Sequence, residues 1–220
     1  MRVAVYYAPA LDDPLWRVAC TWLGRDPETG ATRPQPDLPG IDELTASPRL
    51  YGFHATLKPP MRLGTHYAAF LEDARRVAAT LPAFALPPLQ VADISGFLAL
   101  RETRYCPELH DLADACVTKL DSHRASPDDA ELARRRKAGL PPEQDEMLVR
   151  WGYPHVLSTW FFHMTLTRRL TGAERKTVRP AAEAFLAPVL QHKRRVDALC
   201  IFTQTAPGAP FLIAERLPLG

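Results

Sequence analysis

The chain has 220 residues, of which 46% are hydrophobic and 24% are charged, a composition that argues against a disordered, collagenous or coiled-coil protein. Lysine and arginine number 27 against 25 aspartates and glutamates, so the formal net charge is only +2. This excess is too small for a protein whose main task is to coat a nucleic-acid backbone, and we expect any anion to be bound locally. The length predicts one large domain or two closely packed halves.

The rest of the composition predicts a stiff, reduced and soluble protein. The 22 prolines against 11 glycines favour ordered connections. The four cysteines (Cys20, Cys106, Cys116 and Cys200) form no C-x-x-C pattern, and we expect them to be reduced and mostly buried. The N-terminus runs straight into an alternating strand, and no apolar stretch approaches the roughly 18 residues needed to span a bilayer. We therefore expect a cytoplasmic protein with no membrane partner.

The first 60 residues predict a strand, a helix, a loop and a second strand. Residues 2–8 alternate as a strand, after which Asp13 is a good N-cap and Gly24 ends a helix of about three turns. Residues 26–40 hold four prolines and two glycines and are predicted to be a loop. Residues 52–58 then read as a strand that Pro59 and Pro60 end.

The middle of the chain predicts a helix, a strand pair and two more helices. Thr65 is predicted to cap a helix that ends near residue 81, and two short strands, near 88–94 and 97–102, flank a turn at Ser95-Gly96. Pro107 opens the next helix, and a further helix is expected between Ser126 and Gly139.

The last third repeats an earlier order of elements. Residues 160–167 read as an apolar strand, Thr171 to Glu174 form a capping box that opens a helix, and residues 196–203 and 211–216 read as a strand pair. Strand, helix, strand, turn and strand thus occur twice, which predicts an internal duplication with half-repeats of about 1–104 and 105–220. Two such halves need each other to bury their sheets, and a ligand is expected in the cleft between them.

The same H-x-T-L pattern opens both predicted repeats. Residues 53–58 read F-H-A-T-L-K and residues 162–167 read F-H-M-T-L-T. Side chains alternate along a strand, so polar and apolar groups separate onto opposite faces. The polar faces carry His54, Thr56 and Lys58 in the first segment and His163, Thr165 and Thr167 in the second.

This pattern suits acid–base chemistry on a phosphoryl group. One neutral imidazole takes a proton from an attacking oxygen while a protonated one gives a proton to the leaving oxygen, and an unperturbed pKa near 6.5 lets both forms coexist. The threonine hydroxyls would donate to phosphoryl oxygens as negative charge develops. The alternative is a hydrogen-bonded strand histidine beside a strand-favouring threonine, which explains one copy better than a symmetric pair.

The paired motifs resemble the two-histidine (2H) phosphoesterases, a superfamily that carries two H-x-[ST]-hydrophobic strands. The resemblance spans nearly the whole chain. It implies an α+β, internally duplicated bilobal fold with two antiparallel sheets lining a central cleft and helices outside. It also implies an enzyme that hydrolyses cyclic phosphodiesters without metal or other cofactor.

A narrower resemblance is to a bacterial branch associated with phosphonate-utilisation operons. It is carried by Y-G-F-H-A-T-L-K-P-P at 51–60, R-W-G-Y-P at 150–154 and W-F-F-H-M-T-L-T at 160–167. This branch implies a small sugar cyclic phosphate as substrate, such as a ribosyl 1,2-cyclic phosphate. The motif by itself does not choose that substrate over a nucleotide.

The resemblance assigns roles to individual residues. His54 and His163 are the expected catalytic pair, with Thr56 and Thr165 as phosphate ligands, and substrate orientation decides which histidine is the acid. The flanking residues expected to bind substrate are Lys58, Thr167, Arg49, Tyr51, Tyr153 and Arg168. Each flanking arginine has the alternative reading of ordinary surface charge.

Other polar and aromatic residues are weaker candidates. Tyr6 and Tyr7 point in opposite directions along the first strand, so at most one faces the cleft. The basic run 134–137 is better explained as a solvated helix face than as an RNA contact. The remaining histidines have no metal-ligand spacing, so no metal site is predicted.

Three readings remain open for function. The first is an enzyme that opens a small cyclic phosphodiester, with loops 26–50 and 124–155 bounding its specificity. The second acts on RNA ends or 2′,3′-cyclic nucleotides as the 2′,5′-RNA ligase-like proteins do, although long nucleic acid is not an expected partner at this net charge. The third is a non-catalytic protein that binds a phosphate ligand. A monomer is expected in each case.

Overall fold

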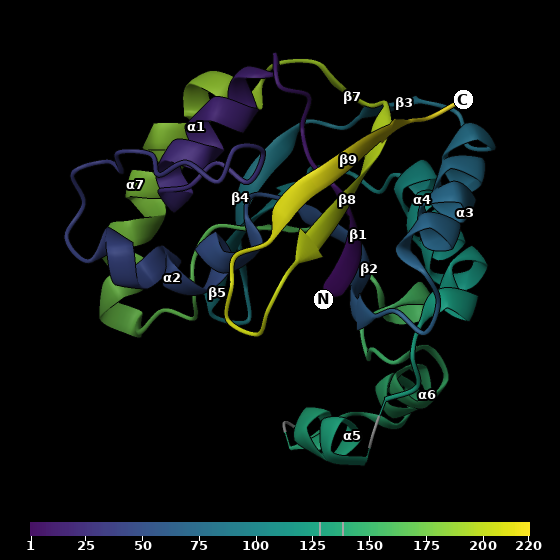
Figure 1. Ribbon diagram of the computed structural model, residues 1–220. Helices are drawn as coiled ribbons and strands as arrows, with labels where there is room; N and C mark the ends of the chain where they lie inside the picture. The colour runs from purple at the N-terminus through teal and green to yellow at the C-terminus, as the bar shows by residue number, and fades with distance from the viewer. Residues whose placement is uncertain (128, 138) are drawn as a thin grey trace.

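The computed structural model describes residues 1–127, 129–137 and 139–220. Its strands are β1 (Arg2–Tyr7), β2 (Ala55–Arg62), β3 (Phe84–Leu86), β4 (Leu89–Ile94), β5 (Phe97–Glu102), β6 (Met164–Thr165), β7 (Arg194–Val196), β8 (Ala198–Gln204) and β9 (Leu212–Pro218). Its α-helices are α1 (Pro14–Leu23), α2 (Ile41–Tyr51), α3 (Tyr67–Ala79), α4 (Pro107–Lys119), α5 (Asp129–Arg136), α6 (Pro142–Trp151) and α7 (Gly172–Leu190). Figure 1 shows their arrangement.

The predicted α+β class with antiparallel sheets is confirmed, but the described strands form one large sheet where two were expected. Seven strands run in the order β4-β5-β6-β2-β1-β8-β9, and β3 pairs with β7 in a small separate sheet. The strands β6 and β2 join the three-stranded and four-stranded arms of the large sheet through one residue pair, Ala55 with Met164. The expected pair of sheets is therefore a pair of arms that meet at the two motif strands.

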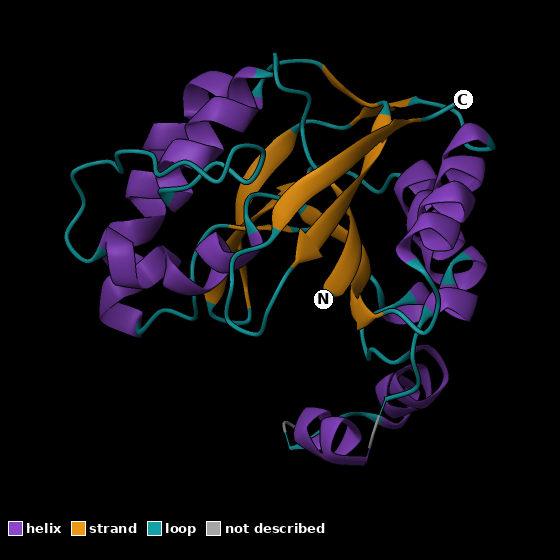
Figure 2. Cartoon of the chain, in the orientation of Figure 1, coloured by secondary structure: helices purple, strands orange, loops and turns teal. Residues whose placement is uncertain are grey.

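Helices flank the sheet on two sides. Figure 1 shows α1, α2 and α7 beside one end of it and α3 and α4 beside the other, while α5 and α6 extend below the main body. Figure 2 shows the strands running between these two helix groups. The largest apolar cluster joins alternate strand residues, such as Val3, Val5 and Tyr7, to α1, α3, α4 and α7. The intervening residues of β1, including Tyr6, point to the opposite face, where they form a smaller cluster with Trp16 and Cys20 of α1 and with Phe202 and Phe211.

Most predicted elements occur where the sequence placed them. The order β2-α3-β3-β4-β5 recurs as β6-α7-β7-β8-β9, which contains the predicted strand, helix, strand and strand and adds one short strand, β3 or β7, to each copy. Thr171 and Glu174 form the expected reciprocal capping box at the start of α7. The helix expected between Ser126 and Gly139 corresponds to α5, but its positions 128 and 138 lie outside the described residues. The division into duplicated half-repeats remains a prediction.

Both motif strands differ from their predicted bounds. β2 does not end at Pro59-Pro60 but runs on to Arg62, because irregularities in its pairing with β1 accommodate prolines that cannot donate to the ladder. β6 is only two residues long, where residues 160–167 were predicted to form a strand. Before it, the Trp160 amide closes a turn onto Leu157, which leaves no regular strand pairing there.

Two helices and one cap were not predicted. The helix α2 has Pro48 in its interior, and α6 buries only Met147 and Leu148, so neither shows a long apolar stripe. Thr65 does not cap α3, because its hydroxyl contacts the Nδ1 atom of His123, and the N-cap position falls on His66.

The cysteines agree with the prediction made from the sequence. All four cysteines are unpaired thiols and buried. Among the residues that the structure describes, none of the helices has the length and apolar character that crossing a bilayer requires.

Candidate active site

The pairing of β2 with β6 brings the two H-x-T-L segments together. Ala55 lies opposite Met164, and both side chains are fully buried in the core. Continuing this antiparallel register places His54 beside Thr165 and Thr56 beside His163. Residues opposite each other on one sheet face have Cβ atoms about 5 Å apart. The four polar side chains therefore occupy one patch on the face of the sheet opposite the main core.

His54 is fixed in one tautomer by its own loop. Its Nδ1 atom lies 2.8 Å from the carbonyl oxygen of Gly52, which only accepts, so Nδ1 carries the proton. The Nε2 atom of the neutral ring then accepts from the Thr56 hydroxyl at 3.3 Å. The Tyr6 ring stacks on the imidazole, with 3.7 Å between ring centroids. This arrangement presents the basic nitrogen of His54 to the pocket.

The Nδ1 contact of His54 recurs at His163. Its Nδ1 atom lies 3.1 Å from the carbonyl oxygen of Phe161, which again stands two residues before the histidine. The Phe97 ring meets the imidazole edge to face at 6.0 Å, and the Phe161 ring lies 4.8 Å away. Both histidines therefore use Nδ1 to fix the ring and leave Nε2 for chemistry.

The pocket holds both histidines in the neutral form near pH 7. Burial, with a smaller contribution from the charge of a protonated His163, lowers the pKa of His54 to about 4 against the opposing effect of the Gly52 carbonyl. Burial also lowers the pKa of His163, with Arg101 and His155 adding to the effect against the Phe161 carbonyl. The sequence suggested ordinary values near 6.5, because it does not report the burial of these rings.

One pocket contains the four motif residues and has a volume of about 340 Å³. This is at the lower end of the range of about 300–1,000 Å³ that is usual for small-molecule sites. The residues that line it are Arg2, Tyr6, Ser47, Pro48, Tyr51, His54, Thr56, Pro59, Pro60, Arg134, Arg135, Tyr153, His163, Thr165 and Thr167. The structure thus brings the predicted Tyr51, Tyr153 and Thr167 together with the four motif residues.

A second pocket adjoins the first along the second motif. It shares Thr56, Tyr153 and His163 with the first pocket, and its other rings come from Phe97, His155, Trp160 and Phe161. The two pockets therefore meet at the motif residues. A phosphoryl group held there would have a polar pocket on one side and an aromatic one on the other.

Lys58 was predicted to share the face of His54 and Thr56, and the structure corrects this. Tyr6 pairs with Thr56 but Val5 pairs with Lys58, so β2 has one extra residue between these two positions. This bulge turns Lys58 to the core face. Its side chain is only 2% exposed, and its Nζ atom donates to the Val117 carbonyl at 3.1 Å and to Asp121 at 3.0 Å. Lys58 holds α4 to the sheet and does not reach the pocket.

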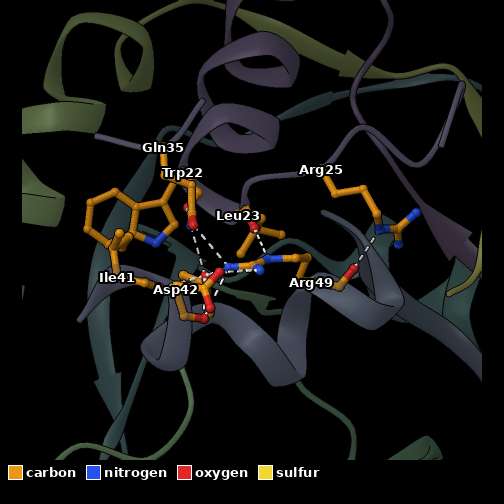
Figure 3. A network of polar contacts seen from close by, with 8 residues as sticks. Trp22, Leu23, Arg25, Gln35, Ile41, Asp42 and Arg49 are labelled. Carbon is orange, nitrogen blue, oxygen red and sulfur yellow. Dashed lines mark hydrogen bonds and ion pairs between the residues drawn. The ribbon is translucent and has the colours of Figure 1, made fainter. Parts of the chain in front are cut away.

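Arg49 was predicted to bind substrate, but it belongs to a structural network between α1 and α2 (Figure 3). Its Nε atom donates to the Leu23 carbonyl at 2.7 Å, and Nη1 donates to Asp42 at 2.6 Å. Its Nη2 atom donates to Gln35 at 3.0 Å and to Thr45 at 2.8 Å. These contacts engage all three nitrogens of the guanidinium, and Arg49 is not among the residues that line the pocket.

Two further predicted substrate ligands have structural partners. Arg168 forms a two-pronged ion pair with Glu174 at the start of α7 and lies outside the set of residues that line the pocket. Thr167 does line the pocket, but its hydroxyl accepts the Leu98 amide at 3.0 Å. Arg168 therefore does not reach the site, and Thr167 stabilises the strand pairing below it.

Three arginines that line the pocket were not predicted from the sequence. Arg134 and Arg135 come from α5, where a solvated face was expected, and Arg2 begins β1. The basic run was visible in the sequence, but nothing local showed that α5 stands beside the motif strands. Tyr6 was ranked as weak, and it is the tyrosine of the first strand that contacts His54.

Comparison with known proteins places most of the chain in a family. Residues 56–212 match the model described as "Protein of unknown function (DUF1045)". A protein of Janthinobacterium sp. (strain Marseille) called ribose 1,5-bisphosphate phosphokinase PhnN is 41% identical over 228 residues, covering 99% of this chain and 50% of that protein. The protein of the same name from Laribacter hongkongensis (strain HLHK9) is 33% identical over 220 residues, covering 98% and 51%. The chain spans about half the length of these curated relatives.

Three solved structures match this chain over nearly its whole length at low identity. A crystal structure called a phosphoesterase covers 99% of this chain and 98% of its own, with 13% identity and a TM-score of 0.47. E. coli LigT complexed with NADP+ covers 99% and 97%, with 14% identity and a TM-score of 0.47. The protein TT0787 of Thermus thermophilus covers 100% and 98%, with 14% identity and a TM-score of 0.47.

Proposed function

The chain belongs to the DUF1045 family, and we propose that it is a phosphodiesterase that opens a small cyclic phosphodiester by acid–base catalysis between His54 and His163. One observation carries the proposal. Both histidines line one pocket, and each donates its Nδ1 proton to the carbonyl two residues before it. The Nε2 atoms of both histidines are thus available at one pocket. The reaction requires this, because one group must remove a proton and another must donate one.

The reaction would proceed in one balanced exchange. The neutral Nε2 of one histidine takes a proton from water as the water oxygen bonds to phosphorus. The bond between phosphorus and one ring oxygen breaks, and the other histidine, in its protonated form, gives its Nε2 proton to that oxygen. The product is a phosphomonoester with a free hydroxyl. The arrangement is symmetric, so substrate orientation assigns the two roles.

The threonines would stabilise the charge that builds up on the phosphoryl oxygens. Thr56 and Thr165 stand two residues after the histidines and line the same pocket. A hydroxyl that donates to a developing oxyanion stabilises the transition state more than the ground state. Burial keeps both histidines neutral in the free protein, and the anionic substrate would raise the pKa of the histidine beside it.

A ribosyl 1,2-cyclic phosphate is the substrate that we favour. The curated relatives, which are about twice as long, are named for a kinase of ribose 1,5-bisphosphate. Breaking the bond from phosphorus to O2 of a ribosyl 1,2-cyclic phosphate leaves a ribose 1-phosphate group. A hydrolase and a kinase that act on the same ribosyl phosphate would be sensible partners in one longer protein.

A 2′,3′-cyclic nucleotide is the second candidate, and the aromatic pocket beside His163 favours it. Rings from Phe97, Trp160 and Phe161 line that pocket, and a nucleobase stacks on such rings.

The test is ³¹P NMR of both substrate classes with the purified protein in EDTA. We expect ring opening of one class, and replacing His54 or His163 with Ala should reduce the rate by about 10² to 10⁴. The matched control is His192→Ala, because His192 is exposed in a groove remote from the pocket. Binding without turnover would contradict the enzyme and indicate a phosphate-ligand binding protein, while loss of turnover in EDTA would contradict the mechanism.

A further inference from the structure

The charge of the histidine pocket comes entirely from arginine. The charged residues among those that line it are Arg2, Arg134 and Arg135, and this set contains no carboxylate. The histidines add no charge near pH 7. A cyclic phosphodiester carries a single negative charge. Arg135 forms an ion pair with Glu131, and the other two guanidinium groups still exceed what the reacting phosphate needs.

Two of these guanidiniums are fixed against aromatic rings. The Arg2 guanidinium lies 5.4 Å from the centre of the Phe211 ring, and its Nε atom donates to Gln204 at 2.8 Å. The Arg135 guanidinium lies 5.2 Å from the centre of the Tyr153 ring, and one terminal nitrogen donates to Glu131 at 2.9 Å. Stacking on a ring reduces the entropy that an arginine loses when it binds an anion.

The same arginines retain unused donors. The Nε atom of Arg135 is buried and has no hydrogen-bond partner within the described part of the chain. Arg134 makes no ion pair with any residue that the structure describes. A buried N–H without a partner is costly, and an oxygen of a bound anion would remove that cost.

Two of the arginines occupy one end of the pocket. Arg2 and Arg134 also line a neighbouring groove with Pro60, Arg62 and Glu131, and that groove contains neither motif histidine nor motif threonine. Arg135 instead stacks on Tyr153, which lines both the histidine pocket and the aromatic pocket. An anion that Arg2 and Arg134 fit therefore lies to one side of the reacting phosphate, with Arg135 beside it.

We propose that the substrate carries a second phosphate group, a phosphomonoester on the same small sugar, and that Arg2, Arg134 and Arg135 bind it. This inference rests on the proposed function and narrows its substrate class. A phosphomonoester is a dianion near pH 7, and its three terminal oxygens match the planar donor pairs of guanidinium groups. The product of ring opening would then be a sugar bisphosphate.

The test compares ribosyl 1,2-cyclic phosphate with and without a 5-phosphate. We expect wild-type kcat/KM to favour the 5-phosphorylated compound by about 10² or more, the scale of two charge-assisted hydrogen bonds. In the Arg134→Gln/Arg135→Gln variant this ratio should fall below about tenfold, mainly through KM for the phosphorylated compound. The control is Arg136→Gln, which removes one positive charge from α5, half of what the double variant removes, at an arginine that pairs with Asp145 and does not line the pocket.

Each outcome decides one question. A wild-type ratio near one, or a ratio that the double variant leaves intact, overturns the second phosphate and leaves the proposed function standing. If the wild type opens neither compound, the proposed function fails, and calorimetry with ribose 1,5-bisphosphate then tests the arginines alone. Weaker binding in the Arg134→Gln/Arg135→Gln variant but not in Arg136→Gln would support the anion site, and equal binding in all three proteins would overturn it.

Discussion

The indole N–H of Trp160 donates a hydrogen bond to the carbonyl oxygen of Thr56, with 2.8 Å between the two atoms. The bond joins the segment that leads into the second motif to the strand that carries the first. It complements the pairing of β2 with β6, which consists of a single residue pair. The His110 ring packs edge to face on the indole at 4.8 Å and fixes its orientation. The relative position of His54 and His163 therefore depends on Trp160.

Replacing Trp160 with Phe should lower kcat as well as the free energy of unfolding. Phenylalanine retains part of the packing but leaves the Thr56 carbonyl without its donor, at a cost of about 1–3 kcal/mol in the free energy of unfolding. The variant also loses the hydrogen bond that joins the two motif segments. We expect kcat to fall by about tenfold or more, because small misplacements of catalytic groups are costly. Steady-state kinetics and urea unfolding measure the two effects. A stability loss with unchanged kcat would show that the bond has no part in positioning the site.

The pH profile should differ between the free enzyme and the complex. The base must be neutral and the acid protonated, so kcat/KM falls above the pKa of the acid in the free enzyme. Burial lowers the pKa of His54 to about 4 and also lowers that of His163. The kcat/KM maximum should therefore lie below pH 6.5. The bound anion favours the protonated ring, so the kcat maximum should lie at higher pH. Coinciding maxima above pH 7 would contradict this.

The threonine hydroxyls should act on kcat. We expect Thr56→Val and Thr165→Val each to lower kcat by about 100-fold, equivalent to about 2.7 kcal/mol, the scale of one lost oxyanion donor. Ground-state binding should change much less, so KM should stay within a few-fold. Thr56→Ser and Thr165→Ser retain the hydroxyl and serve as matched controls that should recover most of the rate. Full rates in both valine variants would remove the proposed role.

The features that depend on neighbouring residues could be predicted from the sequence, whereas the features that depend on tertiary packing could not. The pair of H-x-T-L segments identified His54 and His163 because two-residue alternation puts each histidine and its threonine on one face. The same alternation failed at Lys58, since a β-bulge depends on how the partner strand pairs. It could not find Arg134 and Arg135 either, because their place beside the motif strands follows from the packing of α5. Long-range placement therefore decided which arginines belong to the site.

Lys58 should prove structural. Burial lowers its pKa, although the contact with Asp121 works in the opposite direction. In Lys58→Met, Asp121 keeps its two-pronged ion pair with Arg124, so its buried charge is not left without a partner. We therefore expect a loss of only about 1–3 kcal/mol in the free energy of unfolding. KM should change less than about twofold, because the side chain faces away from the pocket. A large rise in KM with unchanged stability would place Lys58 at the substrate after all.

Arg49 offers the sharpest contrast between a sequence expectation and the structure. If it bound substrate, Arg49→Lys would raise KM and leave stability nearly intact. In the structure its guanidinium bonds to Leu23, Asp42, Gln35 and Thr45 at once, and a lysine ammonium cannot reproduce this planar set of donors. We therefore expect Arg49→Lys to lose about 2–3 kcal/mol in the free energy of unfolding, with KM unchanged.

The matched control is Asp42→Asn, which alters one partner of Arg49. The Asp42 side chain is 78% exposed, so this change should cost less than about 1 kcal/mol. Urea unfolding of both variants, with KM measured on the same preparations, separates the two accounts. A KM that rises about tenfold in Arg49→Lys while the unfolding midpoint stays in place would return Arg49 to the substrate site, and a parallel loss of stability without a change in KM would confirm that it joins α1 to α2.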